Sequence, residues 1–478
     1  MNDATWAALL ALTLVAFMLR AWHLDTQSLW RDEVDVVRFA GWPLSQLVGS
    51  LTVGRHNGPL YYVLMRGWLT LAGHSEFALR FPSLGFSVVV VLLTWQVGAQ
   101  LVGRRAALLA ALLVAISPYL VWYGQDAKMY ALVSTLTLLA TTCLWKALAT
   151  GRWQWWAGLV VAASLSLYVH MLTALMIPVY AVALPLAYPR FRSRWRGWLI
   201  SLSLLTVPYI PMAAWQLPLV LRAHDTGHPS YSLKQIVSSL FNLYARGVAV
   251  VGGWVALAAF MFAILVGVVV TGARINGRLI RVKVFLVLWL FLPVGLVYLI
   301  SLRAAVFEPR YLIYVAPSFY LLAALGIVGL TRLVPVVGGA VLALVLSYSL
   351  LGVATQAVNP IKSDFRAAAA YVMAHHQNHE PIMFQMPYVR HAFDYYFGAD
   401  YVALEGPWTN DDKSVESVAS LMASSVGEHT DVWLVVSEEW LWDSRGLTLA
   451  WLDAHGQSVE SARFALVDVY HYRLAGPH

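Results

Sequence analysis

The sequence predicts a polytopic α-helical membrane protein that carries a small α/β domain at its C-terminal end. Hydrophobic residues make up 60% of the 478 residues and charged residues only 12%, whereas globular proteins are roughly 25% charged. The apolar residues gather in runs close to the roughly 20 residues that a helix needs to cross the hydrocarbon of a bilayer. These runs stop near residue 358, and the composition then becomes polar.

About eleven apolar runs have spanning length. We expect membrane spans at approximately 5–21, 82–102, 106–123, 129–149, 154–170, 171–188, 197–215, 249–271, 284–301, 311–330 and 334–355.

The loops between these spans fall into two sets. One set is basic and contains no acid; it holds Arg104, Arg105, Arg152, Arg190, Arg192, Arg194, Arg196, Arg274, Arg278, Arg281, Lys283 and Arg332. The alternate set holds the acids Asp32, Glu33, Asp35, Asp126, Asp225 and Glu308. Basic loops face the cytoplasm, so the acidic loops and the C-terminal domain are predicted to be external. The net charge of +7 is then explained by loop charge, and no nucleic-acid partner is expected.

Residues 22–80 form a long external segment between the first two spans. The stretches Val34–Leu51 and Gly58–Ala72 are too short to span a membrane. Both contain aromatic residues of the kind that lie at membrane surfaces. We therefore predict interfacial helices in this first external loop.

The domain boundary is expected at residue 358, with a membrane module over 1–358 and an external α/β domain over 359–478. Ser363 or Asp364 is expected to cap a helix that runs to about His376. Short β-branched and aromatic runs predict strands in a mixed sheet at Pro381–Met386, Val432–Ser437 and Phe464–Tyr472.

Three external positions carry groups that suit chemistry: Asp32 with Glu33, Asp126 with Lys128, and Glu308-Pro-Arg310. Carboxylates where a chain leaves the bilayer can meet a substrate whose tail lies in lipid and whose head lies in water. Structural explanations remain open. The first pair suits a solvated first turn of a helix, Asp126 suits a tight turn, and Lys128 suits a helix-end anchor.

The numbers and spacing of cysteine and histidine residues limit which disulfides and metal sites the protein can form. The single cysteine, Cys143, excludes an intramolecular disulfide and a cysteine-based metal cluster. The external histidines show no metal-ligand spacing. The histidine spacing therefore does not decide whether the protein needs a metal.

Motifs in these loops resemble the glycosyltransferase C superfamily, and within it the family 39-like branch that includes protein O-mannosyltransferases and is related to lipid A aminoarabinose transferases. The resemblance covers roughly residues 1–330. It rests on an ordered set of motifs: Trp30-Arg-Asp-Glu33, His56-Asn-Gly-Pro-Leu-Tyr-Tyr62, Ser75-Glu-Phe-Ala-Leu-Arg-Phe-Pro-Ser83, Tyr123-Gly-Gln-Asp-Ala-Lys-Met-Tyr130, Leu167-Tyr-Val-His170 and Pro309-Arg-Tyr-Leu312. Lys128 stands where the family has arginine, and Asn57 stands where the aminoarabinose transferases have lysine.

The resemblance implies an inverting transfer of a sugar from a polyprenyl-phosphate donor to a lipid, glycan or protein acceptor at the external, periplasmic face of the inner or plasma membrane, where the C-terminal domain would also lie. Asp32 would be the general base, beside Glu33, and Asp126 would orient the acceptor or bind a divalent metal together with Asp32 or Glu33. Lys128 and Arg310 would stabilise the leaving phosphate. The other substrate-binding candidates are His56, Asn57, Tyr61, Arg80, Tyr130 and Tyr311.

Two other classes of function compete with this interpretation. A lipid or sugar transporter, or flippase, would place ionisable groups near the middle of its spans, and we find none there. A scaffold would use the external domain to bind partners, but about eleven spans exceed what an anchor needs.

Overall fold

The computed structural model describes residues 3–50, 58–187, 193–207, 210–211, 213–214, 218, 229–250, 253–269, 277–377, 380–411 and 413–475. The chain divides into two compact units. The first comprises Met1–Leu24 and Phe39–Val358, and the second comprises Asp25–Arg38 and Asn359–His478. The acid-bearing segment that follows the first helix therefore belongs to the same unit as the C-terminal residues.

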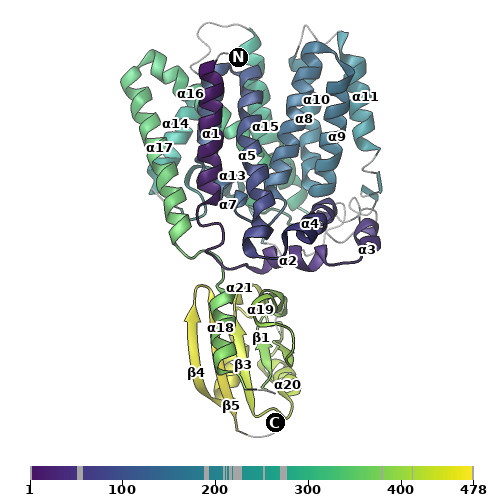
Figure 1. Ribbon diagram of the computed structural model, residues 1–478, viewed down its shortest axis with the longest axis vertical. Helices are drawn as coiled ribbons and strands as arrows, with labels where there is room; N and C mark the ends of the chain where they lie inside the picture. Colours follow the sequence, from purple (N-terminus) through teal and green to yellow (C-terminus); the bar gives the residue numbers. More distant parts are fainter. Residues whose placement is uncertain are drawn as a thin grey trace. The chain divides into compact units, whose positions relative to one another are not determined.

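The first unit is helical (Figure 1). Its long helices run side by side, and α3 and α4 lie at one end of the bundle. The elements are α1 (Asp3–Ala21), α3 (Leu44–Gly49), α4 (Pro59–Ala72), α5 (Glu76–Leu101), α6 (Arg104–Ala115), α7 (Pro118–Gly124), α8 (Tyr130–Thr150), α9 (Trp153–Val169), η1 (Met171–Leu175), α10 (Met176–Leu186), α11 (Trp195–Thr206), α13 (Leu233–Arg246), α14 (Gly253–Val269), α15 (Gly277–Ser301), η4 (Pro309–Val315), α16 (Ala316–Leu333) and α17 (Pro335–Val358).

Each predicted span overlaps a described apolar helix. In the part of the chain that the structure describes, six helices are long and apolar enough to cross a membrane: α1, α5, α8, most of α15, η4 with α16, and α17. The pair α6 and α7, bent by 58°, makes a seventh if it is one span. The remaining helices in predicted spans are shorter, and the span predicted at 197–215 lies partly outside the described residues. The membrane-protein fold class is confirmed; the number of crossings stays a prediction.

Small residues allow a close contact between α14 and α16 in this unit. A Cβ atom placed on Gly326 of α16 would lie 1.7 Å from the carbonyl oxygen of Ala263 in α14, and one on Gly267 would lie 2.4 Å from that of Leu322. Membrane helices often pack in this way, because small residues let their backbones approach. Larger side chains at these two glycines would force α14 and α16 apart.

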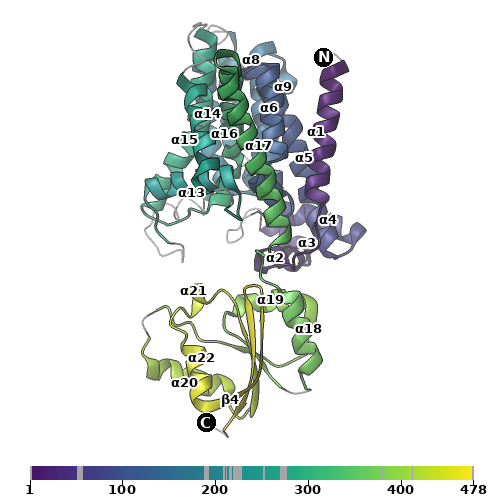
Figure 2. The same cartoon turned by 90° about the vertical axis from the view of Figure 1, so that its left-hand side faces the viewer.

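The second unit contains a five-stranded mixed sheet in the order β2-β1-β3-β5-β4. The pairs β1–β2 and β1–β3 are parallel, whereas β3–β5 and β4–β5 are antiparallel. Figure 2 shows α18 and α19 on one side of the sheet and α20 and α22 on the other. The elements are α2 (Arg31–Ala40), which begins in this unit, α18 (Phe365–His375), β1 (Ile382–Phe384), η5 (Pro387–Val389), α19 (Arg390–Phe397), β2 (Ala403–Glu405), α20 (Val415–Val426), β3 (Asp431–Val436), α21 (Glu439–Trp442), α22 (Leu447–His455), β4 (Gly456–Phe464) and β5 (Val467–Leu474).

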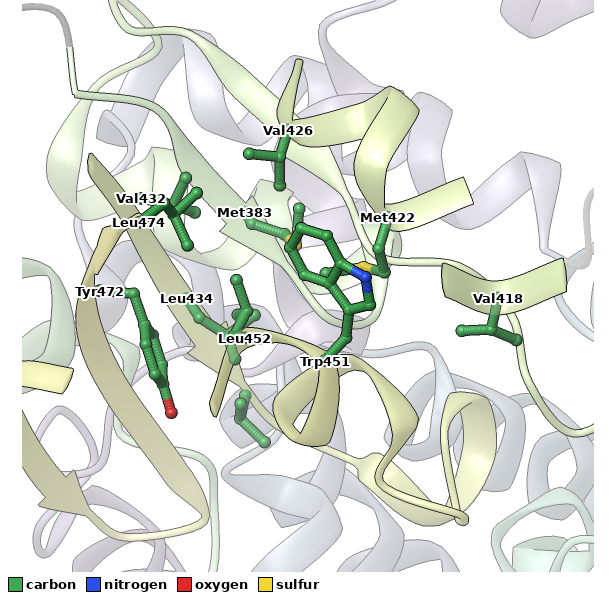
Figure 3. Close-up of a cluster of buried hydrophobic side chains, with 11 residues drawn as sticks. Met383, Val418, Met422, Val426, Val432, Leu434, Trp451, Leu452, Tyr472 and Leu474 are labelled. Carbon is green, nitrogen blue, oxygen red and sulfur yellow. The ribbon is translucent and has the colours of Figure 1, made fainter. Parts of the chain in front are cut away.

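Alternation along β3 and β5 gives the sheet two different faces. One face meets α20 and α22 in a hydrophobic core, part of which is seen in Figure 3: Met383, Val418, Met422, Val426, Val432, Leu434, Trp451, Leu452, Tyr472 and Leu474. The other face carries Asp431, Trp433 and His471. Since strand side chains alternate with a period of two, the same strands supply the core on one face and, on the other, Asp431 and His471 beside the buried Val435 and Val469.

The secondary structure predicted for the C-terminal domain is largely confirmed. Asp364 caps α18, because its Oδ1 accepts a hydrogen bond from the amide of Ala367 at 3.0 Å. The three predicted strands match β1, β3 and β5, and the sheet is mixed as predicted. The strands β2 and β4 were missed. β4 follows α22 without a loop and is mostly exposed, so it lacks the apolar alternation of a core strand.

Candidate functional site

Asp32 and Glu33 lie in the first turn of α2, where the helix dipole favours acids, but their surroundings differ. Glu33 is fully buried, and its Oε2 lies 2.9 Å from the Nζ of Lys362, itself 6% exposed. The Asp32 side chain is 15% exposed and lies 3.9 Å from the guanidinium of Arg31. The pair is therefore not a uniformly solvated turn: Glu33 sits in a buried ion pair, and Asp32 is the more accessible acid.

Hydrogen bonds within the second unit fix the segment that leads into α2. The Oε1 of Gln27 accepts from the amides of Ile361 at 3.0 Å and Lys362 at 3.1 Å. The Oγ of Ser28 donates to the carbonyl of Ser363 at 3.1 Å. The segment that carries the acids is thus tied to the residues that open the C-terminal part of the chain.

Charged groups further along α2 face α19. His391 lies near Arg38, Asp35 and Asp394, and burial lowers the pKa of its imidazole. Arg38 acts in the same direction, whereas the two carboxylates oppose it. Burial and a nearby cation both disfavour the protonated ring, so His391 favours its neutral form.

Asp126 and Lys128 lie in the turn between α7 and α8, and both are buried, Asp126 fully and Lys128 to 6% exposure. The Lys128 amide donates to the carbonyl of Asp126 at 2.7 Å, and the Oγ of Ser83 donates to the carbonyl of Lys128 at 3.1 Å. A side chain that merely caps a turn or reaches for the membrane surface would be exposed. The burial of both groups favours a functional interpretation, since buried charge is costly.

Four side chains from three parts of the first unit gather beside this turn. The ring of Tyr311 stacks near that of Tyr130, with centroids 6.5 Å apart, and lies 5.0 Å from that of His170. The guanidinium carbon of Arg310 lies 5.9 Å from the centroid of the Tyr311 ring. The structure thus brings together Tyr130, Arg310 and Tyr311, three of the predicted substrate-binding residues.

His170 completes this group. It is 1% exposed and follows the end of α9. Its Nδ1 accepts a hydrogen bond from the amide of Leu172 at 3.3 Å, which assigns the proton of a neutral ring to Nε2. Nε2 has no hydrogen-bond partner among the described residues. The site residues predicted from the sequence do not include His170. The signal that could have identified it is its position at the end of the motif Leu167-Tyr-Val-His170.

Three tyrosine hydroxyls hold η4, which carries Arg310 and Tyr311. Tyr119 donates to the carbonyl of Pro309 at 3.1 Å, and Tyr244 donates to that of Leu312 at 2.9 Å. Tyr314, in η4 itself, donates to the carbonyl of Leu172 at 2.6 Å. These contacts from α7, α13 and the start of η1 define where the two substrate-binding candidates lie.

The motif before α4 also approaches this region. Gly58 has φ of +86°, and a Cβ atom there would lie 2.8 Å from the side chain of Met129 and 2.9 Å from the carbonyl oxygen of Val169. Tyr61, one turn into α4, is 1% exposed. Glycine is therefore needed at position 58, because the backbone has a positive φ there and no room is left for a side chain. The predicted site residues His56 and Asn57 lie outside the described residues.

Arg80 binds main chain in the structure. Its Nη1 donates to the carbonyl of Leu24 at 2.8 Å, and the residue is 2% exposed. This contact supports a positioning role for Arg80. The joint role of Asp32, Glu33 and Asp126 in one reaction stays a prediction, since the first two belong to the second unit and Asp126 to the first.

Comparisons with known proteins agree with the motifs. The family model described as "Dolichyl-phosphate-mannose-protein mannosyltransferase" matches residues 56–215. No curated protein sequence matches the chain.

Solved structures extend the likeness to the whole chain. ArnT from Cupriavidus metallidurans bound to undecaprenyl phosphate is similar with a TM-score of 0.59 and 12% identity, over 98% of both chains. The Archaeoglobus fulgidus oligosaccharyltransferase in complex with Zn and sulfate is similar with a TM-score of 0.57 and 12% identity, over 97% of this chain and 72% of that one. The structure of AglB from Archaeoglobus fulgidus with an inhibitory peptide and a dolichol-phosphate is similar with a TM-score of 0.54 and 11% identity, over 98% and 74% of the two chains. At these identities the likeness establishes the fold, and that fold agrees with the fold predicted from the sequence.

Proposed function

Because the chain has the fold of the glycosyltransferase C superfamily, we propose that it is a membrane glycosyltransferase that takes its sugar from a polyprenyl-phosphate donor. The match of residues 56–215 to the mannosyltransferase family model supports this. So do the lipid phosphates in two structures of the same fold, undecaprenyl phosphate in ArnT and dolichol-phosphate in AglB.

The observation that carries the proposal is the group formed by Tyr130, His170, Tyr311 and Arg310 beside the buried turn of Asp126 and Lys128. A lipid phosphate that leaves a sugar needs charge stabilisation, which Lys128 and Arg310 can supply. The Nε2–H of His170 is a further donor for a phosphate oxygen. Aromatic rings offer flat apolar surfaces on which sugar rings pack.

The reaction we propose inverts the anomeric carbon. An acceptor hydroxyl or amine attacks that carbon from the face opposite the phosphate, and its proton passes to the Asp32 carboxylate. The bond between the anomeric carbon and the phosphate oxygen breaks, and its electron pair leaves with the lipid phosphate monoester. Asp126 orients the acceptor. Asp32 is the better base of the first pair, because it is the more exposed acid.

Glu33 suits a positioning role better than direct participation. Its Oε2 already faces the Lys362 ammonium at 2.9 Å, and a divalent metal on the same carboxylate would place two cations side by side. Glu33 therefore does not fit as a metal ligand, and no step of the proposed reaction passes through a metal. The pair instead holds the start of α2, and with it Asp32.

We further propose that transfer occurs on the external face of the inner or plasma membrane. The support is the sequence pattern, since the acids lie in loops that alternate with the basic, cytoplasmic ones. The acceptor belongs to one of three classes of molecule, namely a lipid, a glycan or a protein.

The test uses the purified full-length protein in vesicles, with polyprenyl-phosphate sugars as donors and mass spectrometry of the products. Asp32→Asn and Asp126→Asn are each expected to lower transfer at least about 100-fold, as the loss of a general base or acceptor contact does. Asp35→Asn makes the same change of charge one turn further along α2 and is expected to retain activity. Full activity of Asp32→Asn would remove the base assignment. Movement of lipid across the vesicle without transfer would favour the flippase alternative.

A further inference from the structure

A histidine and two acids meet on the face of the sheet opposite the hydrophobic core formed with α20 and α22. Asp431 is the first residue of β3, and Glu380 precedes β1. His471 lies on β5, opposite Trp433, and two positions from the partner of Asp431, so it shares a face with both. Figure 1 shows β1, β3 and β5 side by side.

The three side chains converge on a small volume. The Nε2 of His471 lies 3.6 Å from Oε1 of Glu380 and 3.7 Å from Oδ1 of Asp431. One ligand atom from each residue lies within 4.8 Å of the other two. These separations exceed hydrogen-bond length. They approach the roughly 3.4 Å between neighbouring ligand atoms of a tetrahedral ion with bonds of about 2.1 Å.

His471 is buried without a hydrogen bond at its inward nitrogen. The residue is 7% exposed, and Nε2 has no hydrogen-bond partner among the described residues. Its ring stacks on Trp433, with centroids 4.4 Å apart and planes within 6°. Buried polar atoms in proteins are nearly always satisfied. A rigidly held imidazole that aims an unsatisfied nitrogen between two carboxylates is the arrangement a bound cation needs.

Each carboxylate has one oxygen fixed by the protein and one turned to the histidine. Oε2 of Glu380 accepts from the indole of Trp433 at 2.7 Å and from the amide of Gln377 at 3.0 Å. Oδ2 of Asp431 accepts from the hydroxyl of Thr430 at 3.0 Å. Such outer contacts orient the ligands of metal sites.

One cation already lies near this group. The Nε of Arg473 donates a hydrogen bond to Oδ1 of Asp431 at 3.3 Å, and the Arg473 side chain is 68% exposed. A long exposed side chain can swing into solvent at little cost. A bound ion would therefore displace Arg473 from Asp431 rather than be excluded by it.

We propose that Glu380, Asp431 and His471 bind a divalent transition-metal ion of the Zn²⁺ class. One imidazole and two carboxylates suit such an ion, and three protein ligands leave a coordination position for water or a further ligand. The ion joins Glu380, which precedes β1, to the first residue of β3 and to β5. Its binding therefore stabilises this unit. The site is independent of the proposed sugar transfer.

The test uses the full-length protein in detergent, purified with a tag that contains no histidine and stripped with a chelator. Zn²⁺ binding is followed by calorimetric titration and by metal analysis after dialysis. The wild type is expected to bind one ion more than His471→Gln or Asp431→Asn. The control is His455→Gln, because His455 also stacks on a tryptophan, Trp451 at 4.2 Å, and belongs to no group of three such ligands in the part of the chain described. The His455→Gln variant is expected to bind Zn²⁺ as the wild type does.

Trp433→Phe gives a second measure, because it keeps an aromatic ring beside His471 and removes only the indole donor to Glu380. Loss of an outer contact of this kind typically weakens metal binding by about 10–100-fold. Zn²⁺ is expected to raise the unfolding temperature of the wild type and of His455→Gln but not of His471→Gln. Equal Zn²⁺ stoichiometry in the wild type and in both folded ligand variants would overturn the proposal. The proposal would also be overturned if neither the wild type nor Arg473→Ala bound Zn²⁺.

Discussion

The buried ion pair between Glu33 and Lys362 provides the sharpest test of how the acid segment is held. Lys362→Met removes the ammonium but keeps an unbranched side chain, which leaves the Glu33 carboxylate buried without its cation. The two charged atoms lie 2.9 Å apart at exposures of 0% and 6%. Their attraction at an effective dielectric constant of about 20 is about 6 kcal/mol. Breaking one half of a buried pair costs about 3–5 kcal/mol after the solvation terms are included.

The assay is thermal unfolding of the full-length protein in detergent, followed by tryptophan fluorescence. For a unit of this size, 1 kcal/mol corresponds to about 2–4 °C, so Lys362→Met is expected to lower the transition of the second unit by roughly 6–20 °C. The control is Arg463→Gln, which breaks the exposed pair of Arg463 with Asp468, 4.0 Å apart, and is expected to cost less than about 0.5 kcal/mol. A shift for Lys362→Met no larger than that of the control would refute the reasoning.

The double variant Glu33→Gln, Lys362→Met separates two roles for Glu33. It removes both charges, so little buried charge remains unpaired, and its stability is expected to exceed that of Lys362→Met. If Glu33 positions α2, sugar transfer by the double variant recovers toward the wild-type rate from the lower rate of Lys362→Met. If Glu33 takes part in the chemistry, transfer stays low although stability is restored.

Three further changes test the first unit. Gly58→Ala is expected to lower both transfer and unfolding temperature, because the added methyl group meets Met129 at 2.8 Å and φ is +86°; Gly67→Ala, in open space within α4, is expected to lower neither. Arg20→Met loses four buried hydrogen bonds and is expected to destabilise the protein by at least about 2 kcal/mol, measured as a fall in unfolding temperature. Tyr314→Phe removes a 2.6 Å hydrogen bond that holds η4, and is expected to cost about 1–3 kcal/mol and to reduce affinity for the lipid-phosphate donor in a binding titration.

The sequence predicted the parts of the fold that depend on local pattern. Long apolar runs gave the helices of the first unit, and the polar residues Ser363 and Asp364 marked the start of α18, which Asp364 caps. Short apolar runs gave β1, β3 and β5. The predictions failed at β2 and β4, whose residues show no buried, alternating pattern and pair with strands already formed. Such strands depend on tertiary pairing that periodicity does not report.

The same limit applies to the site. Ordered motifs pointed to Tyr130, Arg310 and Tyr311, which the structure places together. Nothing in the sequence paired Glu33 with Lys362, because the two residues are far apart in the chain and each is an ordinary charged residue. The histidine of the proposed metal site, His471, was equally hidden, since its ligand partners lie in separate elements and match no spaced motif.

Two hydrogen bonds within the first unit hold the chain directly after α1, at Trp22 and Leu24. The side-chain amide of Gln125 donates to the carbonyl of Trp22 at 2.7 Å, and Arg80 donates to that of Leu24 at 2.8 Å. Gln125 directly precedes Asp126, so one turn both carries that acid and holds the end of α1. A displacement of this turn would move Asp126 and the origin of the acid segment together. The chemistry proposed for Asp126 and the position of the chain directly after α1 thus depend on one structural element, although the residues are separated by about a hundred positions in sequence.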